Sequence, residues 1–196
     1  MSGTWPKIYL ARHGQTEWSI TGQHTGVTDL PLTAQGECNA RQLGERLKGL
    51  RFAAVFTSPL QRARRTCELA GFGDQAAVDA DMAEWNYGDY EGRTTSDIQK
   101  ERPGWNLFRD GCPSGESAAQ VGARADRVIA RLRAVGGDAL VFGHRHFLSV
   151  LAARWVGLPA KQGGVLLLSE ASVSIIGYNH TLADPVIQLW NESGTV

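Results

Sequence analysis

A short stretch near the amino terminus combines residues that bind anions with a residue that can attack them. Residues 8–11 form an apolar run that is followed directly by Arg12, His13 and Gly14. Such a run is typical of a buried strand, and charge at its end requires a partner because unpaired buried charge is costly. Glycine permits close approach of a ligand, and the arginine fork matches phosphate. The tripeptide alone indicates an anion-binding active site and a structural arginine beside a histidine equally well.

Two further predicted strands end in polar residues of similar character. Residues 53–57 precede Ser58, with Arg62 about one helical turn further on. Residues 139–142 are followed shortly by His144. Ligands of open α/β sheets bind outside the carboxyl ends of the strands, and helices that begin there direct their amino ends toward an anion. We therefore expect the three strand ends to meet, which favours the active-site interpretation.

The rest of the chain alternates helical with strand patterns. Helices are predicted over about 16–20, 33–50, 60–70, 94–100, 116–135 and 146–156, an ordered loop over 22–31, and late strands over 165–168, 173–178 and 186–189. This alternation predicts an α/β fold of three layers, a mostly parallel central sheet with helices on both faces. No repeat or linker interrupts the chain, so we expect one domain over 1–196, with about 81–115 as an insertion or lid over the site.

Composition limits the partners and the compartment. The 196 residues include 20 Lys and Arg and 20 Asp and Glu, so the formal net charge is zero, and no bulk attraction to nucleic acid or acidic membranes is expected. No apolar stretch is long enough to span a bilayer, and the amino terminus has no signal pattern. Cys38, Cys67 and Cys112 are odd in number and lack metal-ligand spacing. We expect reduced thiols in a cytoplasmic protein, with homo-oligomerisation left open.

Four motifs together resemble the histidine phosphatase superfamily. They are Arg12-His-Gly-Gln-Thr-Glu-Trp18, Ser58-Pro-Leu-Gln-Arg-Ala63, Glu84 before Tyr87-Gly88, and Gly143-His144. Segments 25–33, 84–92 and 109–112 more narrowly resemble the sedoheptulose-1,7-bisphosphatase type of sugar phosphatase and its bacterial relatives. The resemblance implies a phosphoglycerate mutase-like fold. It also implies a phosphatase without metal or cofactor that hydrolyses small phosphomonoesters, sugar phosphates or bisphosphates, through a phosphohistidine intermediate.

The resemblance also implies roles for five catalytic residues. His13 would accept the phosphoryl group as nucleophile, while Arg12, Arg62 and His144 would hold its equatorial oxygens. Glu84 would protonate the leaving alcohol and then activate water. The chemistry requires a neutral His13, whose pKa the two arginines lower, and a protonated Glu84, whose pKa partial burial raises.

Substrate contacts are expected from residues near these five, namely Ser19, Thr25, Gly26, Tyr87 and Arg145. Ser19 is equally well explained as an exposed serine at a helix start, and Tyr87 as a packing residue. Arg145 and Ser149 depart from the family pattern, which usually has glycine and a nearby arginine at these positions. Arg145 either replaces the missing charge or points to solvent. His24 is expected on the surface or in the lid.

Three other interpretations compete with the phosphatase. A phosphoglycerate mutase-type transferase would carry a basic residue after the catalytic glutamate and a longer insertion before the last large helix, whereas Trp85 and the short segment 112–116 favour water as acceptor. A non-catalytic module that binds phospho-ligands would share the motifs. A zinc cluster of histidines would consist of His13, His24, His144 and His146, but their spacing fits no standard zinc pattern, and the arginines would repel a cation.

Overall fold

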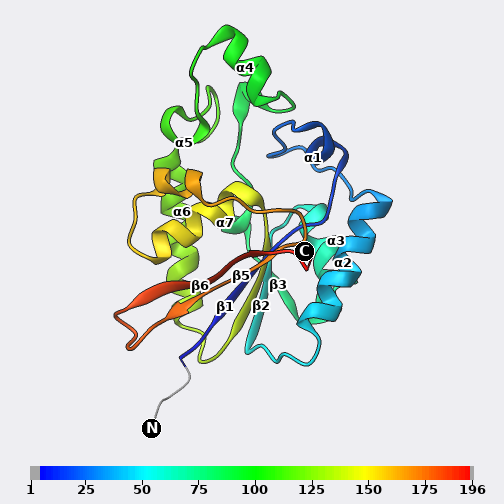
Figure 1. Cartoon of the computed structure of the whole chain (residues 1–196), viewed down its shortest axis with the longest axis vertical. Coiled ribbons are helices and arrows are strands. Elements are labelled where there is room, and N and C mark those ends of the chain that lie inside the picture. The colour runs from blue at the N-terminus through cyan, green and yellow to red at the C-terminus, as the bar shows by residue number, and fades with distance from the viewer. Residues whose placement is uncertain (1–4, 195–196) are drawn as a thin grey trace.

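A six-stranded sheet forms the centre of the computed structural model, which describes residues 5–194 (Figure 1). In spatial order its strands are β3 (Ala76–Val78), β2 (Ala54–Thr57), β4 (Ala139–Gly143), β1 (Ile8–Arg12), β5 (Val173–Tyr178) and β6 (Pro185–Glu192). The first four are parallel to one another, whereas β5 runs antiparallel to both of its neighbours. The predicted α/β class with a mostly parallel sheet is confirmed.

Strand β1 shows why its apolar run is continuous. Ile8 and Leu10 belong to the hydrophobic cluster on one face of the sheet, and Tyr9 and Ala11 belong to the cluster on the other face. All four are buried. Because successive side chains of a strand point to opposite faces, a strand covered on both sides has no polar alternation.

Helices cover both faces of the sheet, as predicted. α2 (Ala34–Leu47) and α3 (Gln61–Leu69) pack on the face of Tyr9, whereas α6 (Ala118–Arg133) and α7 (Arg145–Trp155) pack on the face of Ile8. Three shorter helices lie beyond the end of the sheet to which β1 runs, at the top of Figure 1: α1 (Glu17–Thr21), α4 (Thr95–Glu101) and α5 (Leu107–Asp110). The carboxyl ends of the parallel strands therefore lie beneath a cap of short elements.

Capping residues begin the two longest helices. The Thr33 hydroxyl accepts the Gly36 N–H at 3.0 Å, at the cap that the sequence predicts. Ser117 and Gln120 form a reciprocal capping box at the start of α6. Such caps satisfy N–H groups that have no partner inside the helix, so the sequence determines where these helices begin.

The prediction of a strand over residues 165–168 is wrong. Val165 ends the 3₁₀ turn η4 (Ala160–Val165), and the following residues are irregular. Val165 and Leu167 are 76% and 61% exposed, so this apolar run does not fill the core. Its carbonyl groups accept hydrogen bonds from side chains, including that of Arg12, rather than from a neighbouring strand. The short edge strand β3 was not predicted.

The segment 81–115 contributes most of the cap above the sheet (Figure 1). It contains the turn η3 (Gly88–Tyr90) together with α4 and α5, and it begins within the turn η2 (Ala80–Met82). The Glu91 carboxylate accepts the N–H groups of Gly26 at 2.8 Å and Thr28 at 3.0 Å, which ties the segment to loop 22–31. Its movement as a lid, and the single domain over 1–196, stay predictions.

The structure gives two observations that bear on the cellular compartment expected from the sequence. Within residues 5–194, no helix combines the length and apolar character needed to cross a bilayer. The three cysteines are unpaired, with Cys38 exposed, Cys67 buried and Cys112 partly buried. Residues 1–4 lie outside the described residues. They begin the amino-terminal stretch for which the sequence predicts no signal peptide.

We predict that Gly36→Ala destabilises the fold. A Cβ atom at Gly36 would lie 2.1 Å from the carbonyl oxygen of Gln15, so α2 could not keep its approach to the loop after β1. Overpacking of this kind costs about 1–3 kcal/mol in the free energy of unfolding, measured by urea denaturation. Gly136→Ala is the matched control, since a Cβ there meets open space. Equal unfolding midpoints for the two variants would contradict the close approach.

Candidate active site

His13 follows the last residue of β1, and contacts with the main chain hold it there. Its N–H donates to the Gly143 carbonyl at 3.0 Å, and its own carbonyl accepts the Ala171 N–H at 3.1 Å. Ring atom Nδ1 lies 2.7 Å from the Gly14 carbonyl oxygen. Because a carbonyl can only accept, Nδ1 carries the proton and Nε2 keeps its lone pair. The ring is therefore anchored with an unprotonated nitrogen available for attack.

Two arginines and a second histidine lie close to His13, and these four residues are called the His13 cluster: Arg12, His13, Arg62 and His144. The ring centroids of His13 and His144 are 5.2 Å apart. Burial, followed by the charges of Arg12 and Arg62, lowers the pKa of His13 well below its usual range. Burial and the charge of Arg62 lower the pKa of His144 in the same way. Both imidazoles are thus neutral at pH 7.

The cluster contains buried polar atoms without partners. They are Arg12 Nε, Arg62 Nε and His144 Nδ1. Ser58 Oγ accepts the Leu60 N–H and lies 2.7 Å from His144 Nε2. Because the hydroxyl hydrogen of Ser58 has no other acceptor among residues 5–194, we assign it as the donor to Nε2, which places the proton of His144 on Nδ1. Buried polar groups are nearly always hydrogen-bonded, and all three atoms here are donors. Three unpaired donors in one cationic cluster fit an anion.

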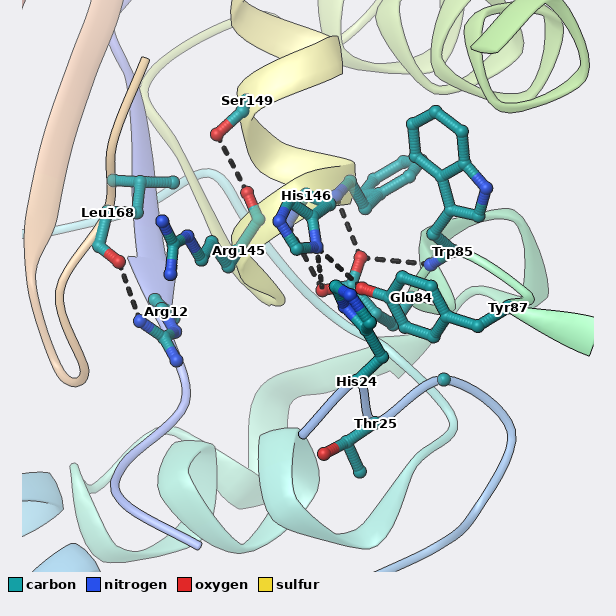
Figure 2. Close-up of polar contacts among 12 residues, drawn as sticks. Arg12, His24, Thr25, Glu84, Trp85, Tyr87, Arg145, His146, Ser149 and Leu168 are labelled. Carbon is teal, nitrogen blue, oxygen red and sulfur yellow. Dashed lines mark hydrogen bonds and ion pairs between the residues drawn. The ribbon is translucent and has the colours of Figure 1, made fainter. Parts of the chain in front are cut away.

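The guanidinium groups of the cluster are positioned by carbonyl groups of irregular segments. Arg62, which is fully buried, donates through its two Nη atoms to the carbonyls of Thr25, Gly26 and Thr28 at 2.9–3.0 Å. Arg12 donates from Nη1 to the Leu168 carbonyl at 2.6 Å (Figure 2). Loop 22–31 and the chain before β5 therefore set the direction of both cations.

Glu84 is buried at the amino end of α7 (Figure 2). Its Oε1 accepts the N–H groups of Trp85 and Phe147, both at 2.9 Å, and Oε2 accepts the N–H of His146 at 3.1 Å. Burial raises the pKa of this carboxyl above its usual range, although the three N–H groups and the charge of Arg62 oppose the shift. The side chain is therefore fixed in place and holds its proton to higher pH than an ordinary glutamate.

A cleft of about 210 Å³ opens beside these groups. Arg12, His13 and Glu84 line it, whereas Arg62 and His144 are fully buried and do not. Among residues 5–194, no group of three or more His, Cys, Asp or Glu side chains is arranged to hold a metal ion. The structure thus brings the five predicted catalytic residues together at one end of the sheet, with the chemistry of an anion site.

The expected substrate contacts divide into two sets. Thr25, Tyr87 and Arg145 line the cleft together with Ser19. Gly26 does not: it is buried, and its carbonyl accepts a bond from Arg62. The Ser19 hydroxyl is already used, since it exchanges hydrogen bonds with the main chain of Thr16 at the start of α1.

The two departures from the family pattern have different surroundings. Arg145 lines the cleft, and Figure 2 shows its side chain extending from the start of α7 toward Arg12. Ser149 is buried one turn further along the helix, and its hydroxyl contacts the carbonyl groups of Arg145 at 2.8 Å and Leu166 at 2.6 Å. Of the two, only Arg145 faces the cleft.

Sequence reasoning did not predict several residues of the cleft, among them His24 and Glu170. His24 was expected on the surface or in the lid, but it is only 9% exposed and its ring centroid lies 4.7 Å from that of Tyr87. Burial and the charge of Arg145 lower the pKa of His24 to about 4. Glu170 also lines the cleft, with its carboxylate 3.5 Å from Arg12. No pattern marked Glu170, because it follows a run that resembled a strand.

Comparison with known proteins agrees with this geometry. Residues 8–193 match the sequence model of the histidine phosphatase superfamily, branch 1. Sedoheptulose 1,7-bisphosphatase of Saccharomyces cerevisiae is 41% identical over 186 residues, covering 78% of this chain and 68% of that protein. An acid phosphatase of Mycobacterium tuberculosis is 39% identical over 178 residues, covering 89% and 87%. The solved structure of an open reading frame product from the same species has a TM-score of 0.91 at 37% identity, covering 97% and 99% of the two chains. The chain therefore belongs to the histidine phosphatase superfamily, and the family and enzyme class that its motifs predict are confirmed.

Proposed function

We propose that this chain is a metal-independent phosphatase that hydrolyses small phosphomonoesters, sugar phosphates or bisphosphates, through a phosphohistidine at His13. The observation that carries the proposal is the neutral His13 ring, whose Nε2 is unprotonated beside two buried arginines. The related sedoheptulose bisphosphatase and acid phosphatase support the reaction class. A small phosphorylated metabolite is the expected partner, and a cytoplasmic location rests on the three unpaired cysteines.

In the first step, His13 Nε2 attacks phosphorus opposite the leaving oxygen. The N–P bond forms as the bond from phosphorus to the alcohol oxygen breaks, and Glu84 gives that oxygen its proton. Negative charge is spread over the equatorial oxygens in such a transfer. We expect Arg12, which lines the cleft, to stabilise these oxygens together with the buried charge of Arg62 and the buried His144 ring behind it.

In the second step, Glu84 acts as a base. It has lost its proton to the alcohol, and it takes one from the water that attacks phosphohistidine. The N–P bond then breaks, inorganic phosphate leaves, and His13 and Glu84 return to their starting protonation states. The three main-chain N–H groups on Glu84 stabilise the charged form between the two steps.

Transfer to a second organic acceptor, as in a mutase, is the alternative. The side chain after Glu84 is Trp85, which is fully buried and donates from Nε1 to the Glu116 carbonyl at 2.9 Å. It therefore adds no charge that would retain a phosphorylated acid in the cleft. This placement supports water as the acceptor.

His13→Ala should abolish hydrolysis. With the nucleophile removed, we expect kcat to fall by at least about a thousandfold, measured as phosphate release from a panel of sugar phosphates, sugar bisphosphates and phosphoglycerates. Rapid quenching with ³²P-labelled substrate should trap acid-labile label on the wild type and none on the variant. His180→Ala is the matched control, because His180 is exposed and away from the cleft. An unlabelled wild type that still turns over would contradict the phosphohistidine.

The loss of activity in Glu84→Gln should depend on the leaving group of the substrate. With a sugar phosphate, kcat/KM should fall by about 10²–10⁴-fold, because the alkoxide needs a proton. With p-nitrophenyl phosphate the loss in kcat/KM should be much smaller, since nitrophenolate leaves without one. Glu45→Gln, on the exposed side of α2, serves as control. Equal losses with both substrates would remove Glu84 from the role of general acid.

The pH dependence should follow the two shifted pKa values. Hydrolysis of a sugar phosphate should slow as pH rises through the pKa of Glu84, which burial places above the ordinary range for glutamate. Because the pKa of His13 is lowered well below its usual range, its protonation should slow the reaction only in clearly acidic solution. Both limbs are read from kcat/KM against pH. An alkaline limb that persists in Glu84→Gln would show that another group causes it.

A further inference from the structure

Arg145 places a positive charge in the cleft that no step of the proposed reaction uses. It is the first residue of α7, it is half-buried, and it lines the cleft (Figure 2). Its main-chain carbonyl accepts a bond from Ser149. Its guanidinium, in contrast, has no hydrogen bond or ion pair with any residue in the range 5–194.

The neighbouring charged groups leave Arg145 uncompensated. Arg12 is held by the Leu168 carbonyl and by Glu170. The carboxylate of Glu84 is occupied by three main-chain N–H groups. A cation that is partly removed from water without a partner is unfavourable, so this guanidinium suits an anionic group of a ligand.

Other cations are available for the phosphate at His13, since the charges of Arg12 and Arg62 act on that ring and lower its pKa together with burial. Arg145 lines the cleft with Arg12, His24 and His146, and its side chain extends toward Arg12 (Figure 2). Burial lowers the pKa of these three residues, and the charge of Arg145 adds to the lowering. Arg145 is therefore a further cation at the cleft, beyond the two arginines of the His13 cluster.

Besides its charged residues, the cleft that Arg145 lines presents several polar groups that carry no charge. Tyr87 hydroxyl lies 2.5 Å from His146 Nδ1, and His24 Nε2 lies 3.3 Å from the Thr95 hydroxyl of α4. Burial keeps both imidazoles neutral and raises the pKa of Tyr87 well above its usual value. These groups offer hydrogen bonds to sugar hydroxyls, while Arg145 adds a cation beyond those of the His13 cluster.

We propose that Arg145 determines specificity by binding a second anionic group of the substrate, a phosphate or a carboxylate that the carbon chain separates from the reacting ester. The inference rests on the proposed phosphatase function and narrows its substrates to small molecules with two anionic ends. A guanidinium donates to either group in a fixed fork, and the charge would act mainly on KM because the group does not react.

The test compares three substrates in wild type, Arg145→Gln and Arg145→Lys. The substrates are a sugar bisphosphate, a phosphoglycerate and a sugar monophosphate of similar length. In Arg145→Gln, the ratio of kcat/KM for a doubly anionic substrate to that for the monophosphate should fall by about 10- to 100-fold, the usual effect of losing a charged hydrogen bond. The doubly anionic substrate with the larger fall identifies a phosphate or a carboxylate as the bound group. Arg145→Lys should recover part of the ratio.

A control variant accompanies this test, and its contrary outcomes separate a failure of this inference from a failure of the proposed function. Arg51→Ala removes an exposed arginine in the segment before β2, outside the cleft, and should leave all ratios unchanged. Equal losses with all three substrates in Arg145→Gln would overturn the proposal by placing Arg145 on the transferred phosphate, and an unchanged ratio would also overturn it. In both cases, hydrolysis of the substrates by the wild type would still support the proposed phosphatase function. A wild type that hydrolyses none would overturn that function and this inference together.

Discussion

Two guanidinium groups held out of water at one end of a parallel sheet are the constraint from which the rest of the site follows. Arg12 is 8% exposed and Arg62 is fully buried. Burying charge is costly unless hydrogen bonds compensate it. Carbonyl oxygens supply part of this compensation, but one nitrogen of each arginine stays unpaired. The fold thus carries a local excess of positive charge that an anionic ligand would offset, although the chain as a whole is neutral.

This constraint also explains why irregular chain surrounds the site. A carbonyl group in a strand is used by the sheet, whereas one in a loop is free to accept from a side chain. Loop 22–31 provides the carbonyls that hold Arg62, and the chain just before β5 provides the one that holds Arg12. Residues 165–168 are apolar enough to suggest a strand, yet their role as acceptors requires them to leave the sheet.

The features that sequence predicts are those set by neighbouring residues. The apolar run of β1, its abrupt end at Arg12, and the cap at Thr33 are all read from short windows, and the structure agrees with each. The burial of His24 depends instead on Tyr87 and Thr95, more than sixty positions away. Likewise, the approach of Glu170 to Arg12 requires the antiparallel return of β5 beside β1. Contacts of this kind have no local pattern.

Burial prepares the acid and the nucleophile of the proposed reaction together. Loss of water disfavours the charged form of any group, so it lowers the pKa of His13 and raises that of Glu84. Each group is thereby held in the neutral form that the first step requires. The arginines support this state for His13 but oppose it for Glu84. A bound phosphate dianion would offset their charge, which favours the proton on Glu84. The same dianion would raise the pKa of His13, so the large lowering of that pKa by burial is what leaves the nucleophile neutral when substrate arrives.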